Sequence, residues 1–112
     1  MTQEDTLNNI KKILSSASLV YSNEDFTSAT ILYFKAIFGV LDFIILKEKG
    51  KTPKDHTERF RIIEDSFPRL YEFLDKYFKI YRDTYSMSID KETCDKIKEN
   101  VNKIVKEYKI PL

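Results

Sequence analysis

Apolar residues recur at the spacing of an α-helix in five stretches of the chain, and no stretch alternates as a β-strand would. The first stretch covers about residues 3–21, and Thr2 is its expected N-cap. A polar turn at residues 22–25 separates it from a long apolar helix over about residues 24–49. Gly50 is expected to end that helix, because glycine readily adopts the left-handed conformation found just past a helix C-terminus.

Three further helices are predicted between residue 52 and the end of the chain. Thr52 as N-cap, Pro53 at the first helical position and Asp55 as capping-box partner predict the start of a short third helix. Pro68 is expected in the first turn of the fourth helix, and Ser88 or Asp90 caps the fifth. The apolar face of the fourth helix consists of Leu70, Leu74, Tyr77, Tyr81 and Tyr85. Such short connections predict antiparallel neighbours. The expected fold is therefore all-α: an up-and-down four-helix bundle with an additional short helix, forming one domain over residues 1–112.

The long second helix has a narrow polar seam. Its polar positions recur every seven residues, at Ser28, Lys35, Asp42 and Lys49. The stretch 29–46 approaches membrane-spanning length, but each of the two charges inside it would cost about 3 kcal/mol near a bilayer centre. The seam therefore predicts the central helix of a soluble bundle with no membrane partner.

Composition excludes several classes of function. The net charge is +1, from 19 basic and 18 acidic side chains, so the sequence does not predict binding to duplex DNA through a broad basic field. Cys94 is the only cysteine, which excludes an intramolecular disulfide and a thiolate zinc site and favours a cytoplasmic location. The polar start of the chain does not read as a signal peptide. No metal or other cofactor is predicted, because His56 stands alone as a possible imidazole ligand.

Several segments in a fixed order resemble a known family. They are an aromatic-rich helix, "ILYFKAIFGVLDFIILKEKG", the loop "KTPKDH", and "HTERFRIIEDSFPRLYEFLDKYFKIYRDTY". Together they resemble the HEPN superfamily (higher eukaryotes and prokaryotes nucleotide-binding domain), over roughly residues 28–106. The third segment is similar to archaeal versions found near minimal nucleotidyltransferases. The resemblance implies a homodimer. It also implies either a ribonuclease of toxin–antitoxin or defence systems, or a partner of a nucleotidyltransferase that binds nucleotide or RNA without cutting it.

The ribonucleases of this family carry an arginine followed, after four to six residues, by a histidine. Carried onto this chain, the arginine is Arg82, and the histidine would fall at residues 87–89, which are Met87, Ser88 and Ile89. None of these can take a proton from a ribose hydroxyl near neutral pH. The resemblance therefore implies a non-catalytic member. Two alternatives stay open: a metal-independent ribonuclease that uses Arg82 with Tyr85 or His56, and a purely structural interaction module.

The candidate site residues lie between residues 56 and 85. All the arginines fall in this part of the chain, and guanidinium groups suit forked contacts with phosphate or carboxylate. His56 either contacts a nucleotide or partner or braces a helix start, and the tyrosine stripe either stacks on bases or fills the core. Gly39, one turn after Ala36, predicts a place where another helix approaches closely. The candidates for binding nucleotide, RNA or a partner are His56, Arg59, Arg61, Arg82 and Asp83, and the catalytic candidates are Arg82 and Tyr85.

Overall fold

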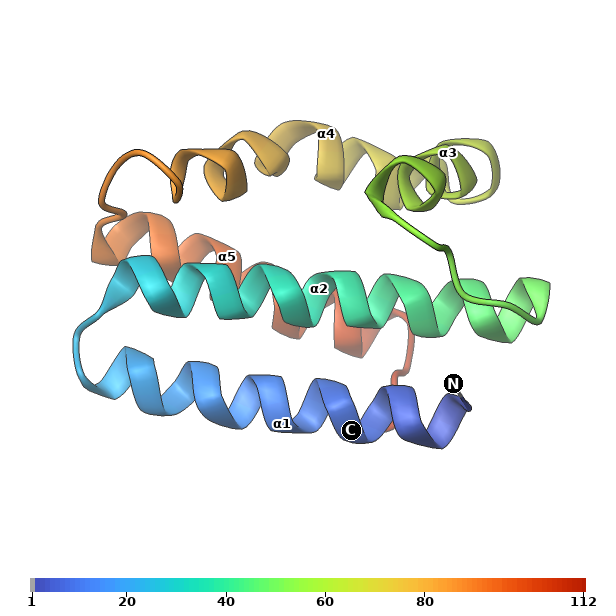
Figure 1. The fold of residues 1–112 in the computed structure, drawn as a ribbon, viewed down its shortest axis with the longest axis horizontal. Helices are drawn as coiled ribbons and strands as arrows, with labels where there is room; N and C mark the ends of the chain where they lie inside the picture. Colours follow the sequence, from blue (N-terminus) through green and yellow to red (C-terminus); the bar gives the residue numbers. More distant parts are fainter. Residues whose placement is uncertain (1) are drawn as a thin grey trace.

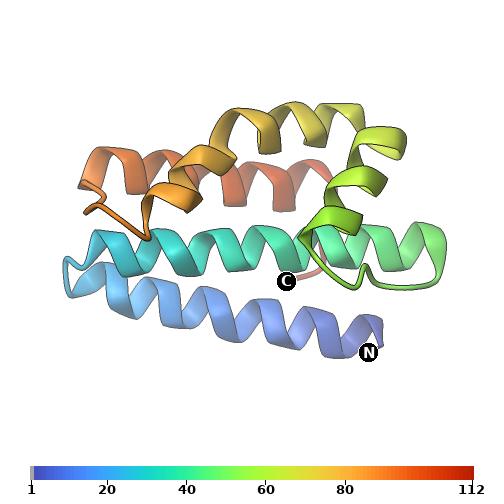
Figure 2. The ribbon, with the colours of Figure 1, turned by 45° about the horizontal axis from the view of Figure 1, so that its top comes forward.

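The computed structural model describes residues 2–112, and within them the chain forms five helices and no strand (Figure 1). This confirms the all-α prediction. The helices are α1 (Gln3–Ser22), α2 (Phe26–Lys49), α3 (His56–Ser66), α4 (Pro68–Asp83) and α5 (Lys91–Glu107). Figure 2 shows α1 and α2 side by side and running in opposite directions, with α4 and α5 on the other side of α2.

Helix α2 is the centre of the molecule, because each of the other helices packs against it. Its residues Phe34, Leu41 and Ile45 are completely inaccessible to solvent. It is also the one described helix long and apolar enough to cross a membrane, yet 67% of its most apolar 18-residue stretch is buried inside the protein. Along the predicted seam, Lys35 and Lys49 are exposed and Ser28 and Asp42 are half-buried. The pattern of α2 is thus that of a core helix with one polar seam.

Most helix ends lie where the sequence predicts them. Thr2 forms a full capping box with Asp5, and Asp90 accepts a hydrogen bond from the backbone N–H of Thr93 (2.8 Å) to cap α5. Gly50 ends α2 with a φ of 79°. Helix α2 begins at Phe26 rather than at residue 24, because Glu24 adopts a φ of 62° and Asp25 is the cap.

The predicted start of the third helix is wrong. Helix α3 begins at His56, and its N-cap is Asp55, whose carboxylate accepts a hydrogen bond from the backbone N–H of Glu58 (2.9 Å). A carboxylate is a better cap than the hydroxyl of Thr52, since its charge also interacts favourably with the helix dipole. Residues 51–55 therefore form a loop. His56 occupies the first helical position, and Arg59 lies one turn further along.

The tyrosine stripe on α4 is shorter than predicted. Helix α4 ends at Asp83, so Tyr85 lies in the turn beyond it and is 78% exposed. Tyr77 and Tyr81 are half-buried within the helix. The backbone reverses direction here through hydrogen bonds from residues 84–87 to carbonyls of residues 80–83, which turns Tyr85 away from the core.

Helices α4 and α5 are antiparallel but do not touch through their backbones. An ion pair between Arg69 and Glu107 (3.1 Å) joins the start of α4 to the end of α5. No two Cα atoms of these helices lie within 8 Å of each other in the described part of the chain. The prediction of antiparallel neighbours is therefore correct in direction, but the two backbones do not come into contact.

Gly39 is the site of a close helix approach, and the approaching helix is α1. A Cβ atom at Gly39 would lie 2.8 Å from Cγ1 of Ile10, which is closer than two carbon atoms can pack. Ile10 itself is completely buried. Glycine at this position thus lets α1 lie tightly along α2.

Candidate functional site

A bidentate ion pair fixes α3 to α2. The Nε and Nη2 atoms of Arg59 donate to the two carboxylate oxygens of Asp42 at 2.6 and 2.9 Å. The side chains are only 11% and 22% exposed, so little water competes for these bonds. Asp42 is the seam residue that faces α3, and the start of α3 at His56 places Arg59 opposite it. The forked geometry suits a guanidinium and not an ammonium group.

His56 bonds to the third nitrogen of the same guanidinium. Nη1 of Arg59 lies 2.6 Å from Nδ1 of His56. Because a guanidinium only donates, Nδ1 must accept, and the imidazole is therefore neutral with its proton on Nε2. Burial, followed by the positive charge of Arg59, holds the pKa of His56 below its ordinary value of 6.5. The arrangement leaves Nε2–H as a hydrogen-bond donor.

Aromatic rings surround one side of His56. Its ring centroid lies 4.7 Å from that of Phe38, 6.1 Å from that of Phe78 and 6.3 Å from that of Tyr81. The guanidinium of Arg59 also lies 5.2 Å from the centre of the Phe38 ring. By total accessible area His56 is exposed, so one side of the imidazole meets solvent while the other meets these rings. The rings come from α2 and α4, and they explain why the charged form of His56 is disfavoured.

A pair of tyrosines extends this cluster to the end of α4. The hydroxyl oxygens of Tyr81 and Tyr85 lie 3.3 Å apart. The hydrogen bond to Tyr85, together with burial, raises the pKa of Tyr81 to about 12. The ring of Tyr81 packs against Phe34 and Phe38 in the core. Tyr81 thus has a structural role: its ring packs in the core, and its hydroxyl forms a hydrogen bond with the hydroxyl of the exposed Tyr85.

Arg82 is exposed beside this pair. Its guanidinium carbon lies 5.9 Å from the centre of the Phe78 ring, which also contacts His56. It forms no ion pair within residues 2–112. Asp83, the next residue, pairs instead with Lys79 (3.0 Å). Arg82 therefore carries an uncompensated charge at the end of α4.

Residues 87–89, where the resemblance would lead one to expect a histidine, offer no acid or base. Met87 and Ser88 are exposed, and Ile89 is largely buried. The backbone N–H of Ile89 donates to the hydroxyl of Thr27 on α2 (2.8 Å), so this stretch ties the turn to the core.

The structure brings some of the predicted site residues together and separates others. His56 and Arg59 bond directly. Arg82 lies over Phe78 and Tyr85 bonds to Tyr81, and these are two of the rings that lie near His56. Arg61 is exposed on α3 without an ion pair in the part of the chain described. Asp42 was not among the predicted site residues, although its place on an otherwise apolar helix signals that it has a buried partner. The described residues contain no group of three His, Cys, Asp or Glu side chains able to hold a metal ion.

Comparisons of the chain with protein-family models, with curated proteins and with solved structures give no match.

Proposed function

We propose that this chain is a non-catalytic, HEPN-like module that binds nucleotide or RNA and acts as a homodimer beside a minimal nucleotidyltransferase of toxin–antitoxin or defence type. In this proposal α1, α2, α4 and α5 are the up-and-down four-helix bundle and α3 is the additional short helix. The observation that carries the proposal is the end of α4, where the exposed Arg82 and Tyr85 stand together without an acid–base group. Exposed arginine and tyrosine side chains are typical of binding surfaces.

The state of His56 supports binding over catalysis. A general base needs a free lone pair, but the lone pair on Nδ1 accepts from Arg59 and Nε2 carries the proton. His56 can take up a second proton only by giving up the bond to Arg59. In its observed state it can donate one hydrogen bond, through Nε2–H, to a phosphate or a base.

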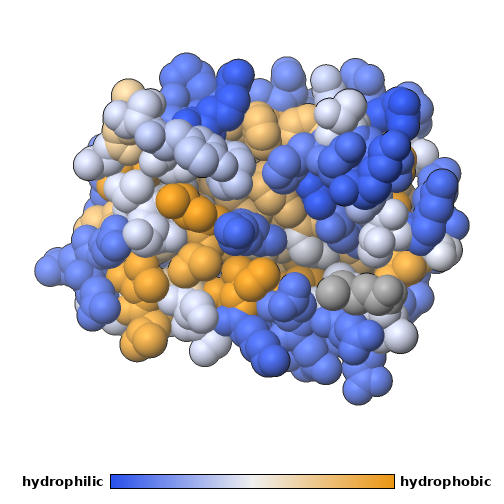
Figure 3. Space-filling view, viewed as in Figure 1, coloured by the Kyte–Doolittle hydropathy of each residue, from blue (hydrophilic) through white to orange (hydrophobic). Residues whose placement is uncertain are grey.

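The dimer is supported by the part of α2 that the other helices leave uncovered. Ile31, Leu32 and Leu46 on this helix are only partly buried. Figure 3 shows apolar side chains reaching the surface along the middle of one face, with hydrophilic side chains around them. Covering such a strip with the same strip of a second copy would remove apolar surface from water on both copies.

A cleavage assay tests the non-catalytic assignment against a ribonuclease that uses Arg82 with Tyr85 or His56. The purified protein is incubated with tRNA and with mRNA, beside an Arg82→Ala variant. We expect both RNAs to stay intact with both proteins. Cleavage by the wild-type protein that disappears in Arg82→Ala would overturn the proposal and establish the ribonuclease.

Light scattering on dilution tests the dimer. The chain has a mass of 13.3 kDa, so a dimer has twice that mass. We expect light scattering to give the dimer mass down to micromolar protein concentrations. A mass of 13.3 kDa at all concentrations would contradict the dimer. Co-expression of the tagged protein with the protein encoded by the neighbouring reading frame tests the partner. We expect that neighbour to be a minimal nucleotidyltransferase and to be retained on the tagged protein. A neighbour of another kind, or one that is absent from the purified material, would count against that part.

A further inference from the structure

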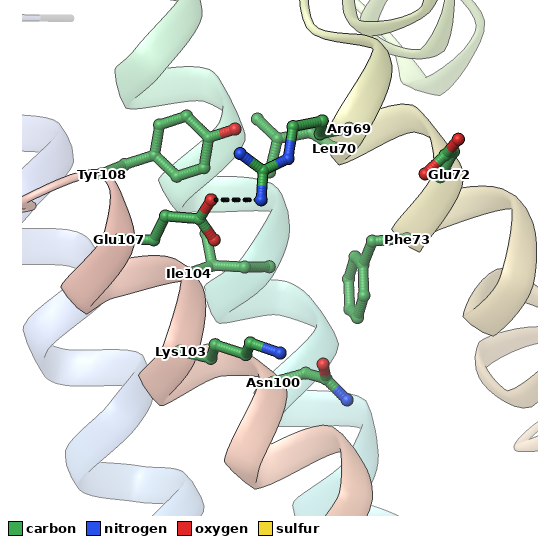
Figure 4. A pocket seen from close by; sticks show the side chains of 9 residues that line it. All are labelled: Arg69, Leu70, Glu72, Phe73, Asn100, Lys103, Ile104, Glu107 and Tyr108. Carbon is green, nitrogen blue, oxygen red and sulfur yellow. Dashed lines mark ion pairs between the residues drawn. The ribbon is translucent and has the colours of Figure 1, made fainter.

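A groove runs between α4 and α5, on a different part of the molecule from the His56 cluster. It consists of two hollows in line along the two helices. One, of about 230 Å³, lies between the start of α4 and the end of α5 (Figure 4). The other, of about 630 Å³, lies between the end of α4 and the start of α5. Since the two backbones stay apart along this line, the groove follows the helices for most of the length of α4, about 20 Å at 1.5 Å per residue.

The free charges along the groove are mainly positive. Lys76 on α4 and Lys96 and Lys103 on α5 line it, and none has an ion pair within residues 2–112. Two of the four acidic groups at its edges are engaged in ion pairs: Glu107 pairs with Arg69, and Asp83 pairs with Lys79. Asp90 caps α5 but keeps its charge, so Asp90 and Glu72 remain beside the three lysines.

The spacing of the lysines suits a chain of anions. Lys96 and Lys103 are seven residues apart, which places them on the same side of α5 at about 10 Å along its axis. Lys76 lies on the opposite wall, with its ammonium group 5.3 Å from the centre of the Tyr77 ring. Lys96 is near enough to Asp90 to help lower the pKa of that carboxyl, but it forms no ion pair with it.

Aromatic rings form part of the same walls. The rings of Phe73 and Tyr77 lie 5.0 Å apart on α4 and are half-buried. Figure 4 shows Phe73 pointing into the space between the helices, with Lys103 and Asn100 opposite. The Nδ2 atom of Asn100 donates to the backbone of α5, so the amide is fixed in position (2.7 Å). Half-covered rings beside free ammonium groups are the combination that binds stacked bases and their phosphates.

The floor of the groove argues against a docked amphipathic helix. Three of its aliphatic residues are already covered by their own chain: Leu70 is 3% exposed, Ile104 6% and Ile89 9%. At the end of α4, Ile80 is half-buried and Met87 is 55% exposed, so aliphatic surface is open there alone. A helix laid over the covered residues would remove little further apolar surface from water, and that removal is the main driving force for such docking. Apart from Ile80 and Met87 at one end, the groove offers mainly ring edges, ammonium groups and one amide.

We propose that the α4–α5 groove binds a single-stranded oligonucleotide, with its phosphates on Lys76, Lys96 and Lys103 and its bases against Phe73 and Tyr77. This rests on the proposed function in that it gives the RNA-binding role a second surface, which adjoins the end of α4 at Asp83. Ribose and deoxyribose strands share the chemistry that these groups recognise, so both are used in the test.

Fluorescence anisotropy of labelled strands measures the binding. The probes are single-stranded RNA and DNA of the same mixed sequence and about 12 nucleotides, within the site sizes of known single-strand binding folds, and the corresponding duplex. The variants are Lys96→Gln with Lys103→Gln, and Tyr77→Ala. A matched control carries Lys11→Gln with Lys12→Gln, which makes the same change of charge on the exposed side of α1. Circular dichroism checks that each variant is folded.

Contacts from three lysines predict a slope of about −2 when the logarithm of the association constant is plotted against the logarithm of the salt concentration. Binding should therefore weaken about 20-fold between 50 and 200 mM salt. Without Lys96 and Lys103 that loss should fall to about 3-fold. Tyr77→Ala should weaken binding about 10-fold. The control should bind as the wild type does, and single strands should bind better than the duplex.

The proposal is overturned if the groove and control variants lose affinity equally, or if the duplex binds as well as the single strands. It is also overturned if no strand binds while an acidic amphipathic helical peptide does. Loss of strand binding in Arg82→Ala with full binding in the lysine variant would overturn the groove and leave the proposed function standing. Loss in the lysine variant with full binding in Arg82→Ala would support the groove and count against the site at the end of α4.

Discussion

The ion pair between Asp42 and Arg59 gives the sharpest prediction about stability. Replacing Asp42 with Asn keeps the shape of the side chain but removes its charge, which leaves the guanidinium of Arg59 largely buried without a counter-ion. Loss of one partner costs about 3–5 kcal/mol in a fully buried pair and about 0–1 kcal/mol at the surface. With side chains 11% and 22% exposed, the pair lies nearer the buried limit. We therefore expect Asp42→Asn to lower the free energy of unfolding by about 2–3 kcal/mol.

This loss is large enough to measure by thermal unfolding. At about 2.1 cal/mol/K per residue, a chain of 112 residues unfolds with an entropy of about 0.24 kcal/mol/K. The expected fall in Tm is then about 8–13 °C. Urea denaturation at fixed pH gives the same free energy independently.

A double-mutant cycle separates the pair from the packing around it. Arg59→Met and Asp42→Leu should each cost at least as much as Asp42→Asn, whereas the two combined should cost less than about 1 kcal/mol, since neither charge is then buried alone. The control is Lys79→Met, which breaks an exposed pair with Asp83 and should change stability by less than about 0.5 kcal/mol. If Asp42→Asn changes stability no more than Lys79→Met does, the pair does not hold α3 in place and our reasoning about it is wrong.

Three further predictions concern packing, pH and thiol reactivity. Gly39→Ala should destabilise the fold by about 1 kcal/mol or more despite the helix propensity of alanine, since its Cβ would lie 2.8 Å from Ile10; Ile10→Ala should largely absorb this cost in the double variant, and strictly additive losses would contradict the contact. The pKa of His56 is lower in the folded protein than its ordinary value of 6.5, so the stability that His56 contributes is present above the unfolded-state pKa and is lost as the pH falls through the folded-state pKa. Chemical denaturation between about pH 5 and 7.5 should show the free energy of unfolding falling with pH. If the same fall persists in His56→Gln, this explanation is refuted. Burial raises the pKa of the Cys94 thiol, so a thiol reagent should modify the native protein only as fast as the chain unfolds, and immediate modification would contradict the burial.

Helical periodicity was sufficient to predict the five helices, because apolar residues recur at helical spacing in each and most boundaries have a cap or a helix-breaking residue. The predicted start of the third helix at Thr52 was wrong because Thr52 and Asp55 can both act as an N-cap. The local sequence does not show which of the two the loop after Gly50 places at the start of the helix. The seam on α2 predicted which of its positions face outward, but not that Asp42 would meet a cation from another helix.

The candidate site was harder to predict because its parts come from three helices. Arg82 and Tyr85 were found through their place in a motif, and His56 through its rarity. Their relation to one another depends on Phe38 and Phe78, which look like ordinary core residues in the sequence. The α4–α5 groove was not predicted, since short connections suggested helices in contact, and the separation of the two backbones is visible only in the folded structure.

The most direct test of the account is a two-dimensional NMR titration of the ¹⁵N-labelled protein with a short single-stranded RNA, followed by analysis of the recovered strand. We expect the backbone amides of Arg82 and Tyr85, at the end of α4, to shift as RNA is added, and the RNA to be recovered uncut. A spectrum in which these amides do not move, or a strand recovered in pieces, would contradict the claim that this chain binds RNA through that site without cutting it.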